Sequence, residues 1–300
     1  MMPVPAEERN ASALDRAFAA LQGLLPTRAL SALMFRVAEW RQPRFKDALI
    51  RLFMRLYPID LSEAERERVA SYEHFNAFFT RALKPGARPQ PSEPEVLSSP
   101  VDGTLSQFGA IRAGTLIQAK GHDYSCADLL RDAALADEFA DGAFATIYLA
   151  PHNYHRVHMP YGGKLRRWIY LPGRLFSVNP RTARALPGLF ARNERMAALF
   201  DTAFGPLAVI MVGALFVGGV ETVWTGRLTP PHRRGTPETY EPMRPVVLPR
   251  GAELGRFHMG STVILLAPKN ALRWMQGLAP GAALRLGQGL AAITPATAAA

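Results

Sequence analysis

The stretch Arg256-Phe257-His258-Met259-Gly260-Ser261-Thr262-Val263-Ile264-Leu265-Leu266 places a Gly-Ser-Thr step directly before an apolar run. A run of aliphatic and β-branched residues behind a turn predicts a buried strand over 261–267. Because glycine lacks a Cβ, the backbone at Gly260 can take up a strained conformation that other residues resist. The hydroxyl of Ser261 could then attack the carbonyl of the preceding peptide. A Gly-Ser-Thr step is usually a plain turn, so this chemistry needs support from other segments.

Short β runs separated by glycine and proline fill most of the chain before this stretch. Besides 261–267, we expect strands at 103–108, 114–119, 143–149, 156–159, 163–170, 207–212 and 215–223. Two helices are expected among them, at 126–137 and 193–201. Strands that outnumber crossover helices argue against a doubly wound parallel sheet. The sequence therefore predicts an α+β fold, with N-terminal amphipathic helices followed by a mainly antiparallel β core.

Loops and a tail complete the expected organisation. The segments 84–98 and 228–250 are rich in Pro, Arg and Glu and are expected to be loops, the second long enough to be a mobile flap. The Ala-, Gly- and Pro-rich segment 287–300 is expected to be a loosely ordered tail. This divides the chain into a helical region at 1–83, a β-rich catalytic core at 84–286, and the tail.

Three amphipathic helices are expected before the β runs. Ser12 and Thr27 could cap the first two, and the third extends from about Arg44 to Tyr57. The apolar stripe of the third helix consists of Phe45, Leu49, Leu52, Phe53 and Leu56. Such stripes usually pack on the protein's own core, and insertion into a membrane surface is the alternative.

The distribution of charge favours the membrane. The chain has a formal net charge of +10 at pH 7, which suits either nucleic acid or an anionic membrane. Segment 26–57 concentrates basic residues, namely Arg28, Arg36, Arg41, Arg44, Lys46, Arg51 and Arg55. They are interleaved with apolar residues at helical spacing, unlike the strand-based aromatic surfaces that read nucleic acid. We therefore expect a membrane partner and no nucleic acid.

The chain is expected to be a peripheral protein. Its longest apolar stretch, 206–220, is shorter than the roughly 20 residues that span a bilayer and is interrupted by glycines. Its N-terminus lacks the features of a signal peptide, and the single cysteine, Cys126, argues for a reducing compartment. These features predict a location on the cytoplasmic side of the cell membrane.

Two upstream segments add a carboxylate and imidazoles to the Ser261 hydroxyl. They are Ser99-Pro100-Val101-Asp102-Gly103-Thr104 and Pro151-His152-Asn153-Tyr154-His155-Arg156-Val157-His158-Met159-Pro160. Together with Phe75-Asn76-Ala77-Phe78-Phe79-Thr80-Arg81-Ala82-Leu83-Lys84-Pro85-Gly86-Ala87-Arg88-Pro89, they resemble a phosphatidylserine decarboxylase of the bacterial, self-processing, pyruvoyl-dependent type. The similarity covers most of the chain. One departure is Met259, where the family more often has leucine, and this swap conserves volume.

The resemblance implies that the chain cleaves itself between Gly260 and Ser261. His158 would act as the general base for the Ser261 hydroxyl and Asp102 would orient it. An acyl shift from nitrogen to oxygen, followed by β-elimination, would leave a covalent pyruvoyl group at residue 261. The cleaved halves, 1–260 and 261–300, would stay together as a heterodimer, and a homo-oligomer of these is left open.

The resemblance also implies the reaction. The pyruvoyl carbonyl would form a Schiff base with the amine of phosphatidylserine and accept electrons as CO2 departs, giving phosphatidylethanolamine. His155 is the candidate for handling the substrate carboxylate or the proton returned to carbon. Residues 155 and 158 face opposite sides of an ideal strand, so the chain must turn for both to line one pocket. Pro151 and Asn153 favour such a turn.

Three alternatives stay open on the residues alone. His152, His155 and His158 could be metal ligands, but no cysteine or carboxylate lies near them, and we expect no metal. A Ser/His/Asp lipid hydrolase would need a Gly-x-Ser-x-Gly elbow before a helix, and Ser261 instead precedes a strand. A non-catalytic, membrane-binding β module would use the basic helices alone.

Overall fold

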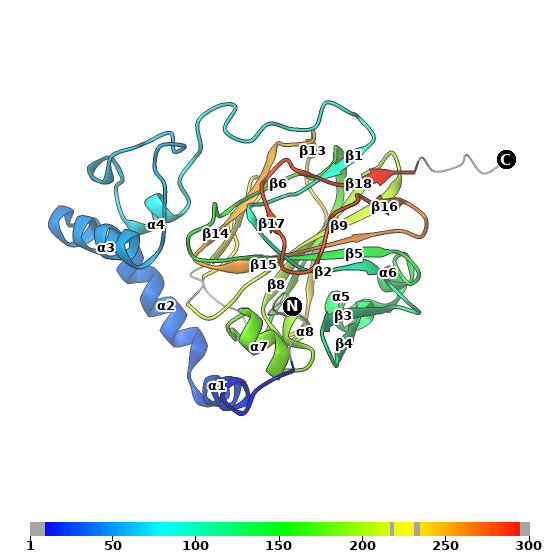
Figure 1. Ribbon diagram of the computed structural model, residues 1–300, viewed down its shortest axis with the longest axis horizontal. Coiled ribbons are helices and arrows are strands. Elements are labelled where there is room, and N and C mark those ends of the chain that lie inside the picture. Colours follow the sequence, from blue (N-terminus) through cyan, green and yellow to red (C-terminus); the bar gives the residue numbers. More distant parts are fainter. Residues whose placement is uncertain (1–9, 217–218, 231–234, 295–300) are drawn as a thin grey trace.

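The computed structural model describes residues 10–216, 219–230 and 235–294. Helices form the N-terminal part and antiparallel strands form most of the rest, so the predicted α+β class is confirmed (Figure 1). The N-terminal helices are α1 (Ala13–Leu24), α2 (Thr27–Ala38), α3 (Pro43–Leu56), a 3₁₀ turn (Val69–Ser71) and α4 (Phe75–Phe79). The first three are the expected amphipathic helices.

The start of α1 is capped as predicted, and the start of α2 is not. Ser12 Oγ accepts a hydrogen bond from Asp15 N at 3.1 Å, and Asp15 Oδ2 accepts one from Ser12 N at 3.2 Å. This reciprocal pair satisfies two N–H groups that have no partner within the helix. Thr27 was expected to cap α2, but it is the first helical residue and Pro26 occupies the cap position. The helix starts one residue earlier than expected, because the Pro26 carbonyl oxygen already accepts the first helical hydrogen bond, from Leu30 N at 3.1 Å.

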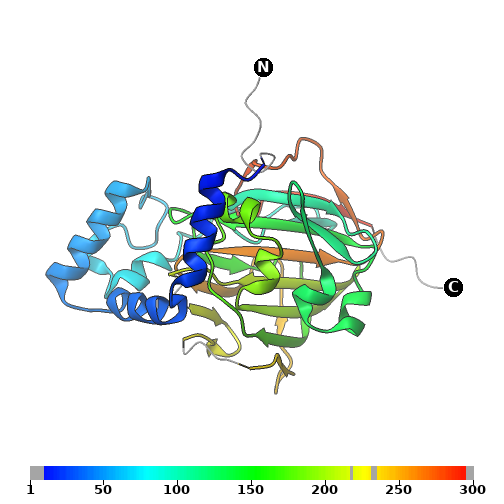
Figure 2. The ribbon, with the colours of Figure 1, turned by 90° about the horizontal axis from the view of Figure 1, so that it is seen from below.

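Polar contacts fix α1 to the β-rich part. The carboxylate of Asp15 accepts hydrogen bonds from Arg181 at 2.9 Å and Arg184 at 3.1 Å, both in α7 (Pro180–Ala185). Figure 1 shows α1 beside α7, and Figure 2 shows α1 crossing one side of the β-rich part. In the described residues no single helix is long and apolar enough to cross a membrane; α1 and α2 meet that test only together, as a pair bent by 82°.

The helical part has a small hydrophobic cluster of its own. Its buried members are Ala38, Ile50, Leu61, Ala64, Tyr72, Phe75, Phe78 and Phe79. Phe53 of α3 packs edge-on against Phe75, with ring centroids 5.1 Å apart. Met259, from far along the chain, packs against the same cluster. The helical part therefore touches the segment that precedes Ser261.

One large antiparallel sheet carries most of the core. Its strand order is β12-β7-β8-β9-β15-β5-β2-β17, and β13 also pairs with β7. The strands are β2 (Gly103–Ala110), β5 (Ala143–Leu149), β7 (Gly163–Leu171), β8 (Arg195–Thr202), β9 (Gly205–Val212), β12 (Glu238–Tyr240), β13 (Val247–Leu248), β15 (Ser261–Ala267) and β17 (Ala283–Leu284). The expected strands at 143–149 and 261–267 match β5 and β15.

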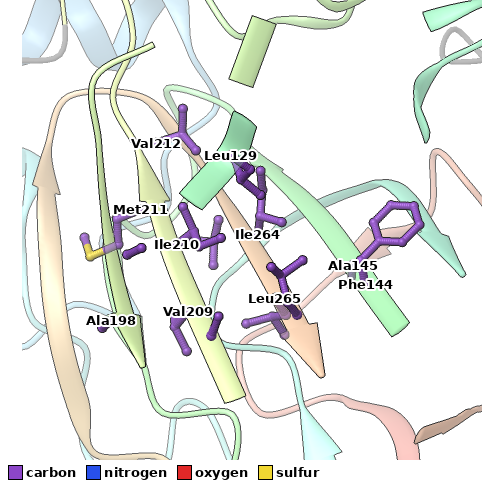
Figure 3. Packing of buried hydrophobic residues seen from close by; sticks show 14 of the residues in the cluster. Leu129, Phe144, Ala145, Ala198, Val209, Ile210, Met211, Val212, Ile264 and Leu265 are labelled. Carbon is purple, nitrogen blue, oxygen red and sulfur yellow. The ribbon is translucent and has the colours of Figure 1, made fainter. Parts of the chain in front are cut away.

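The central strand of this sheet is β15. It is paired on both edges, with β5 and β9, and all seven of its residues are buried. Ile264 and Leu265 pack beside Val209 and Ile210 of β9 (Figure 3). Each such aliphatic side chain contributes about 1.5–3 kcal/mol when it is fully buried. A continuous apolar run suits this position because both faces of the strand are covered.

Smaller sheets and helices surround the large sheet. A four-stranded sheet has the order β11-β10-β14-β6, a three-stranded sheet the order β1-β18-β16, and β3 pairs with β4. These strands are β1 (Val96–Ser98), β3 (Thr115–Ala119), β4 (His122–Ser125), β6 (Arg156–His158), β10 (Gly219–Thr222), β11 (Gly226–Arg227), β14 (Glu253–His258), β16 (Leu272–Trp274) and β18 (Gly289–Ile293). The remaining helices are α5 (Cys126–Leu130), α6 (Ala133–Asp137) and α8 (Leu189–Arg192).

Two expectations about the core are wrong. The helix expected at 193–201 is the strand β8, which pairs along its length with β7 and β9. The tail expected from residue 287 contains β18, which is hydrogen-bonded between β1 and β16. In both segments, strand pairing outweighs local helix propensity or low complexity: β8 forms a tight hairpin with β9 and also pairs with the earlier strand β7, and β18 pairs with the distant strand β1. Residues 295–300 of the expected tail lie outside the described residues.

The loop expected at 228–250 contains two short strands. β12 and β13 both pair with β7 at one edge of the large sheet. Residues 231–234, in the middle of the expected flap, lie outside the described residues. The strand expected at 215–223 is limited to β10 in the described part of the chain. A flap function for this segment stays a prediction.

Candidate active site

The Gly260-Ser261 step lies in a turn between two sheets. β14 ends at His258 and β15 begins at Ser261, so Met259 and Gly260 connect the four-stranded sheet to the large one. Met259 has a φ of 86°, in the left-handed region that costs a non-glycine residue roughly 1–2 kcal/mol. We expected the strained residue to be Gly260, but Gly260 is not in this region. The strain lies one residue earlier, where the Met259 side chain packs on the helical cluster.

Strand register brings the three predicted segments to one end of the large sheet. Ser261 is opposite Leu149, the last residue of β5, and Thr104 of β2 is opposite Tyr148. The segment with Asp102 therefore enters the sheet where the histidine segment leaves it. Gly103 is needed here, because a Cβ at this position would lie 2.5 Å from the Tyr148 carbonyl oxygen. The fold thus assembles hydroxyl, carboxylate and imidazoles from distant parts of the chain.

Ser261 is fully buried, and its hydroxyl has no hydrogen-bond partner among the described residues. The neighbouring Thr262 hydroxyl is in the same situation. A buried polar group without a partner costs about 1–3 kcal/mol, so its presence in a well-packed strand indicates a use other than stability. At Ser261 the adjacent peptide carbonyl of Gly260 offers that use.

His155 is fully buried and carries a bare nitrogen. Its Nδ1 lies 2.8 Å from the Asn153 carbonyl oxygen, which can only accept, so Nδ1 holds the proton. Nε2 is therefore unprotonated, and it is buried with no hydrogen-bond partner among the described residues. The ring lies against Phe79, with centroids 4.1 Å apart. Burial lowers the pKa of His155 to about 3, so the imidazole is neutral at neutral pH.

His158 is also held as a neutral imidazole. Nδ1–H donates to the Gly251 carbonyl oxygen at 2.8 Å, which leaves Nε2 to accept from the Tyr154 hydroxyl at 3.1 Å. Burial lowers the pKa of His158, and the bond to Gly251 and the Glu253 and Asp102 carboxylates oppose this only in part. Burial also raises the pKa of Tyr154 to about 12, so the phenol keeps its proton. His158 is chemically suited to act as a base through Nε2.

Asp102 forms a bidentate salt bridge with Arg88. Arg88 donates from Nε to Oδ1 at 2.9 Å and from Nη2 to Oδ2 at 2.6 Å. Leu286 N also donates to Oδ1 at 2.8 Å. The side chains of Arg88 and Asp102 are only 9% and 11% exposed. These contacts fix the position of the carboxylate.

The segments that carry the predicted catalytic residues are neighbours, but in the described chain no hydrogen bond joins their side chains. His158 N donates to Pro100 O at 2.9 Å, two residues before Asp102. Within the described ranges, no hydrogen bond links Asp102 to His158 or either His155 or His158 to the Ser261 hydroxyl. Their catalytic roles therefore stay predictions. Pro151 and Asn153 do lie in a turn, because Asn153 N donates to Ala150 O at 2.9 Å, but this turn precedes both histidines, so their placement in one pocket stays a prediction.

Sequence reasoning missed Arg88 and Tyr154 as parts of the site. Both lie inside segments that were quoted for the resemblance, but neither residue type points to a particular partner. Arg88 is 14 residues before the carboxylate that it binds, in a segment expected to be a loop. A tyrosine four residues before a histidine gives no signal on a strand pattern. Only the folded contacts reveal their roles.

The helical part also borders the site. Besides the contacts of Phe79 and Met259, Phe35 of α2 lies edge-on to His258, with ring centroids 5.7 Å apart. His258 Nε2 is 3.0 Å from Glu221 Oε2.

Groups of three or more His, Cys, Asp or Glu suited to a metal ion are absent from the described residues. The expectation that no metal takes part stays a prediction.

Comparisons with known proteins give the family. A family model described as phosphatidylserine decarboxylase matches residues 75–292. The chain belongs to the phosphatidylserine decarboxylase family. A second model, described as PSD, matches residues 17–58, which cover most of α1 to α3.

Close relatives within the phosphatidylserine decarboxylase family cover nearly the whole chain. The phosphatidylserine decarboxylase proenzyme of Pseudomonas fluorescens is 52% identical over 278 residues, 92% of this chain and 96% of the relative. The proenzymes of the same name from Pseudomonas paraeruginosa and Pseudomonas entomophila are 52% and 51% identical over 280 residues, 92% of this chain and 97% and 98% of theirs. Their names describe precursors that require processing. Neither the hydrolase nor the non-catalytic module gains support from these matches.

The residues present fit a group formed at position 261. The Ser261 hydroxyl and His155 Nε2 are both buried without a partner in the described chain. A prosthetic group built from Ser261 would replace its unpartnered hydroxyl. It would lie at the end of the large sheet where the segments that contain His155, His158 and Asp102 meet. The geometry is thus compatible with the pyruvoyl group that a phosphatidylserine decarboxylase of the self-processing type requires.

Proposed function

We propose that this protein decarboxylates phosphatidylserine to phosphatidylethanolamine and CO2, using a pyruvoyl group that the chain makes from its own Ser261. The observation that carries the proposal is the buried hydroxyl of Ser261, which has no hydrogen-bond partner among the described residues and lies two residues after the left-handed residue Met259. Family membership supplies the reaction class, and this hydroxyl supplies the position where processing starts.

Processing begins with attack of Ser261 Oγ on the Gly260 carbonyl carbon. The C–N bond breaks, the amine of residue 261 takes a proton, and Gly260 becomes an ester of the serine oxygen. Removal of the α-proton of residue 261 then expels the carboxylate of Gly260 and leaves dehydroalanine. Tautomerisation and hydrolysis consume one water and release one ammonia. The products are residues 1–260 with a free carboxylate and residues 261–300 with a keto cap.

His158 is the base for this sequence. Its imidazole is neutral at neutral pH, so Nε2 is unprotonated. The ring is oriented by its hydrogen bonds to the Gly251 carbonyl and the Tyr154 hydroxyl. Asp102 lies on the adjacent segment, and its carboxylate favours the protonated imidazole that forms when His158 accepts a proton. Nε2 must move within reach of Ser261 in the reacting state, where catalytic hydrogen bonds often tighten.

His155 acts in the decarboxylation. When present, the pyruvoyl group supplies an electrophilic carbonyl that engages the substrate amine and accepts the electrons released as CO2 departs. His155 Nε2 can hold or return a proton at the substrate α-carbon, since its other nitrogen is fixed by Asn153. The ring of Phe79 covers His155 and keeps water away from it. Exclusion of water favours loss of a charged carboxylate as neutral CO2.

The two products of cleavage should remain associated. The fragment 261–300 contributes β15, the buried central strand, which is paired with β5 and β9 of the larger fragment. It also contributes β18, which is paired with β1. Separating the fragments would expose these edges and the apolar side chains of β15. We therefore propose that the mature enzyme is a heterodimer of its own halves.

The helical part is proposed to dock the enzyme on an anionic membrane from the cytoplasmic side. Leucines that are more than half exposed occur on all three long helices: Leu14, Leu21, Leu24, Leu33, Leu52 and Leu56. Exposed arginines on α2, α3 and their connection accompany them: Arg36, Arg41, Arg44, Arg51 and Arg55. Near an anionic leaflet each such charge contributes about 1 kcal/mol. Since Phe35, Phe79 and Met259 link this part to the site, docking places the site near its lipid substrate.

The test is a comparison of the parent chain with Ser261→Ala. The parent should appear as two fragments under denaturing conditions and should release CO2 from phosphatidylserine. Ser261→Ala should remain one chain and release none, because the attacking hydroxyl is gone. Thr262→Ala is the matched control, since it removes a neighbouring buried hydroxyl that is equally partnerless. Equal activity of unbroken Ser261→Ala would refute the proposal.

A further inference from the structure

A buried arginine without a carboxylate partner lies beside the site. Arg81 follows α4 and is only 6% exposed. In the described chain its guanidinium forms no ion pair and one long hydrogen bond, from Nη2 to the His152 carbonyl oxygen at 3.4 Å. Its Nε is buried with no partner. Burying a cation in this way is costly unless an anion compensates the charge. Arg81 therefore points to a ligand.

Arg81 borders a cavity of about 350 Å³ between the helical part and the four-stranded sheet. Thr80 and Arg81 line it from the helical side, and Arg256 and His258 line it from β14. His258 is two residues before Gly260, so the cavity adjoins the turn where processing takes place. His258 Nδ1 is a second buried nitrogen that has no hydrogen-bond partner in the part of the chain that the structure describes. The cavity thus has unused polar groups next to the site.

The other charges around the cavity are compensated or exposed. Arg156 and Arg256 both contact the carboxylate of Glu253, at 2.8 and 2.7 Å. The carboxylates that line the cavity are Glu39, Glu65 and Glu221. Glu39 pairs with Arg227, Glu221 contacts Arg256 and His258, and Glu65 is exposed to solvent. Arg81 is the buried cation of this cavity that has room for a new anion.

We propose that Arg81 binds the phosphodiester of the phospholipid headgroup. The inference rests on the proposed function, which gives the ligand two anionic groups, a phosphodiester and a carboxylate. An arginine on the carboxylate would stabilise the substrate more than the transition state, in which that charge is lost, and would oppose decarboxylation. The phosphodiester keeps its charge throughout and matches the guanidinium fork. It is only a few covalent bonds from the α-carbon, as Arg81 is close in space to the His152–His155 segment.

The experiment measures binding to the full, uncleaved Ser261→Ala chain in detergent. The probes are glycerophosphoethanolamine, which has the phosphodiester without the carboxylate, glycerophosphoserine, which has both, and free serine. Titration calorimetry or NMR should show binding of both phosphodiesters and none of serine. Arg81→Gln should weaken phosphodiester binding at least about tenfold, as expected for loss of a charge-assisted hydrogen bond. Arg66→Gln, at an exposed arginine of the same cavity, is the matched control and should leave binding unchanged.

Two outcomes would overturn the inference. Binding of serine and glycerophosphoserine but not glycerophosphoethanolamine would assign the cavity to the carboxylate, and this result needs no Arg81 variant. Equal phosphodiester affinity in Arg81→Gln and the parent would remove Arg81 from the site. If Arg81→Gln does not fold, Arg81→Lys is made in the chain that retains Ser261. It keeps the positive charge but loses the planar guanidinium, so the cleaved enzyme should decarboxylate phosphatidylserine with a raised KM and little change in kcat. Because binding is measured on a chain that cannot process, its failure leaves the mass test of the proposed function intact.

Discussion

The buried state of His155 predicts a specific dependence of stability on pH. Its pKa in the folded protein is about 3, against 6.5 for an unburied histidine. Between these values the unfolded chain binds a proton that the folded chain does not. The free energy of unfolding is therefore not reduced by this residue above pH 6.5, and it decreases progressively as the pH falls from 6.5 toward 3.

The size of the effect follows from the shift. Each pKa unit corresponds to about 1.36 kcal/mol, so lowering the pH from about 7 to about 4.5 should cost roughly 3 kcal/mol through this residue alone. His155→Gln removes the titrating group and should remove that part of the pH dependence. The partly buried His74 and His158 also have lowered pKa values, but they are common to both proteins and cancel in the difference.

The assay is urea unfolding of Ser261→Ala, with and without His155→Gln, at both pH values. Using the uncleaved background keeps the chain in one piece and makes unfolding a single-chain process. The His155 protein should lose roughly 3 kcal/mol more than the variant on acidification and should take up about one more proton on unfolding near pH 5. Identical pH dependence in the two proteins would refute the claim that His155 is buried as a neutral base.

Three further predictions concern the neighbours of the site and the membrane surface. His158→Ala should slow fragment formation by about a hundredfold or more, the usual contribution of a general base, and Asp102→Asn should slow it less; parent rates on a denaturing gel in both would exclude these roles. Arg88→Gln leaves the Asp102 carboxylate buried without its cation and should lower the free energy of unfolding by roughly 3 kcal/mol in urea, and an unchanged value would show that the pair is dispensable. Leu52→Glu with Leu56→Glu, at side chains 52% and 68% exposed, should reduce co-sedimentation with anionic vesicles while processing continues; full co-sedimentation would move the docking surface elsewhere.

The sequence predicted the parts of the fold whose pattern is local. The Ser12 cap of α1, the apolar spacing of α1 to α3, and the continuous apolar run of β15 each depend on neighbouring residues alone. β8 was assigned wrongly because Met196, Ala197, Ala198 and Leu199 are good helix formers. Their strand conformation comes from the tight hairpin with β9 and from pairing with the earlier strand β7. The pairing with β7 lies outside a local sequence window.

The candidate site shows the same division. Ser261, His155, His158 and Asp102 could be named from their segments, and strand register brings those segments together. The contacts of each side chain could not be predicted, because they depend on loop conformations that bring residues distant in sequence together. Asp102 forms a salt bridge with Arg88 and no hydrogen bond to a histidine in the described chain. The residue with left-handed backbone is Met259 rather than Gly260. Arg81 likewise gains meaning only from its burial beside a cavity.

The most direct test of the account is the intact mass of the purified protein under denaturing conditions, with a carbonyl-reactive probe. The account predicts two species in an active sample: residues 1–260 with a normal carboxylate, and residues 261–300 that react with the probe through a ketone in place of the serine amine and hydroxyl. A single unbroken chain of 300 residues that decarboxylates phosphatidylserine at full rate and does not react with the probe would contradict it.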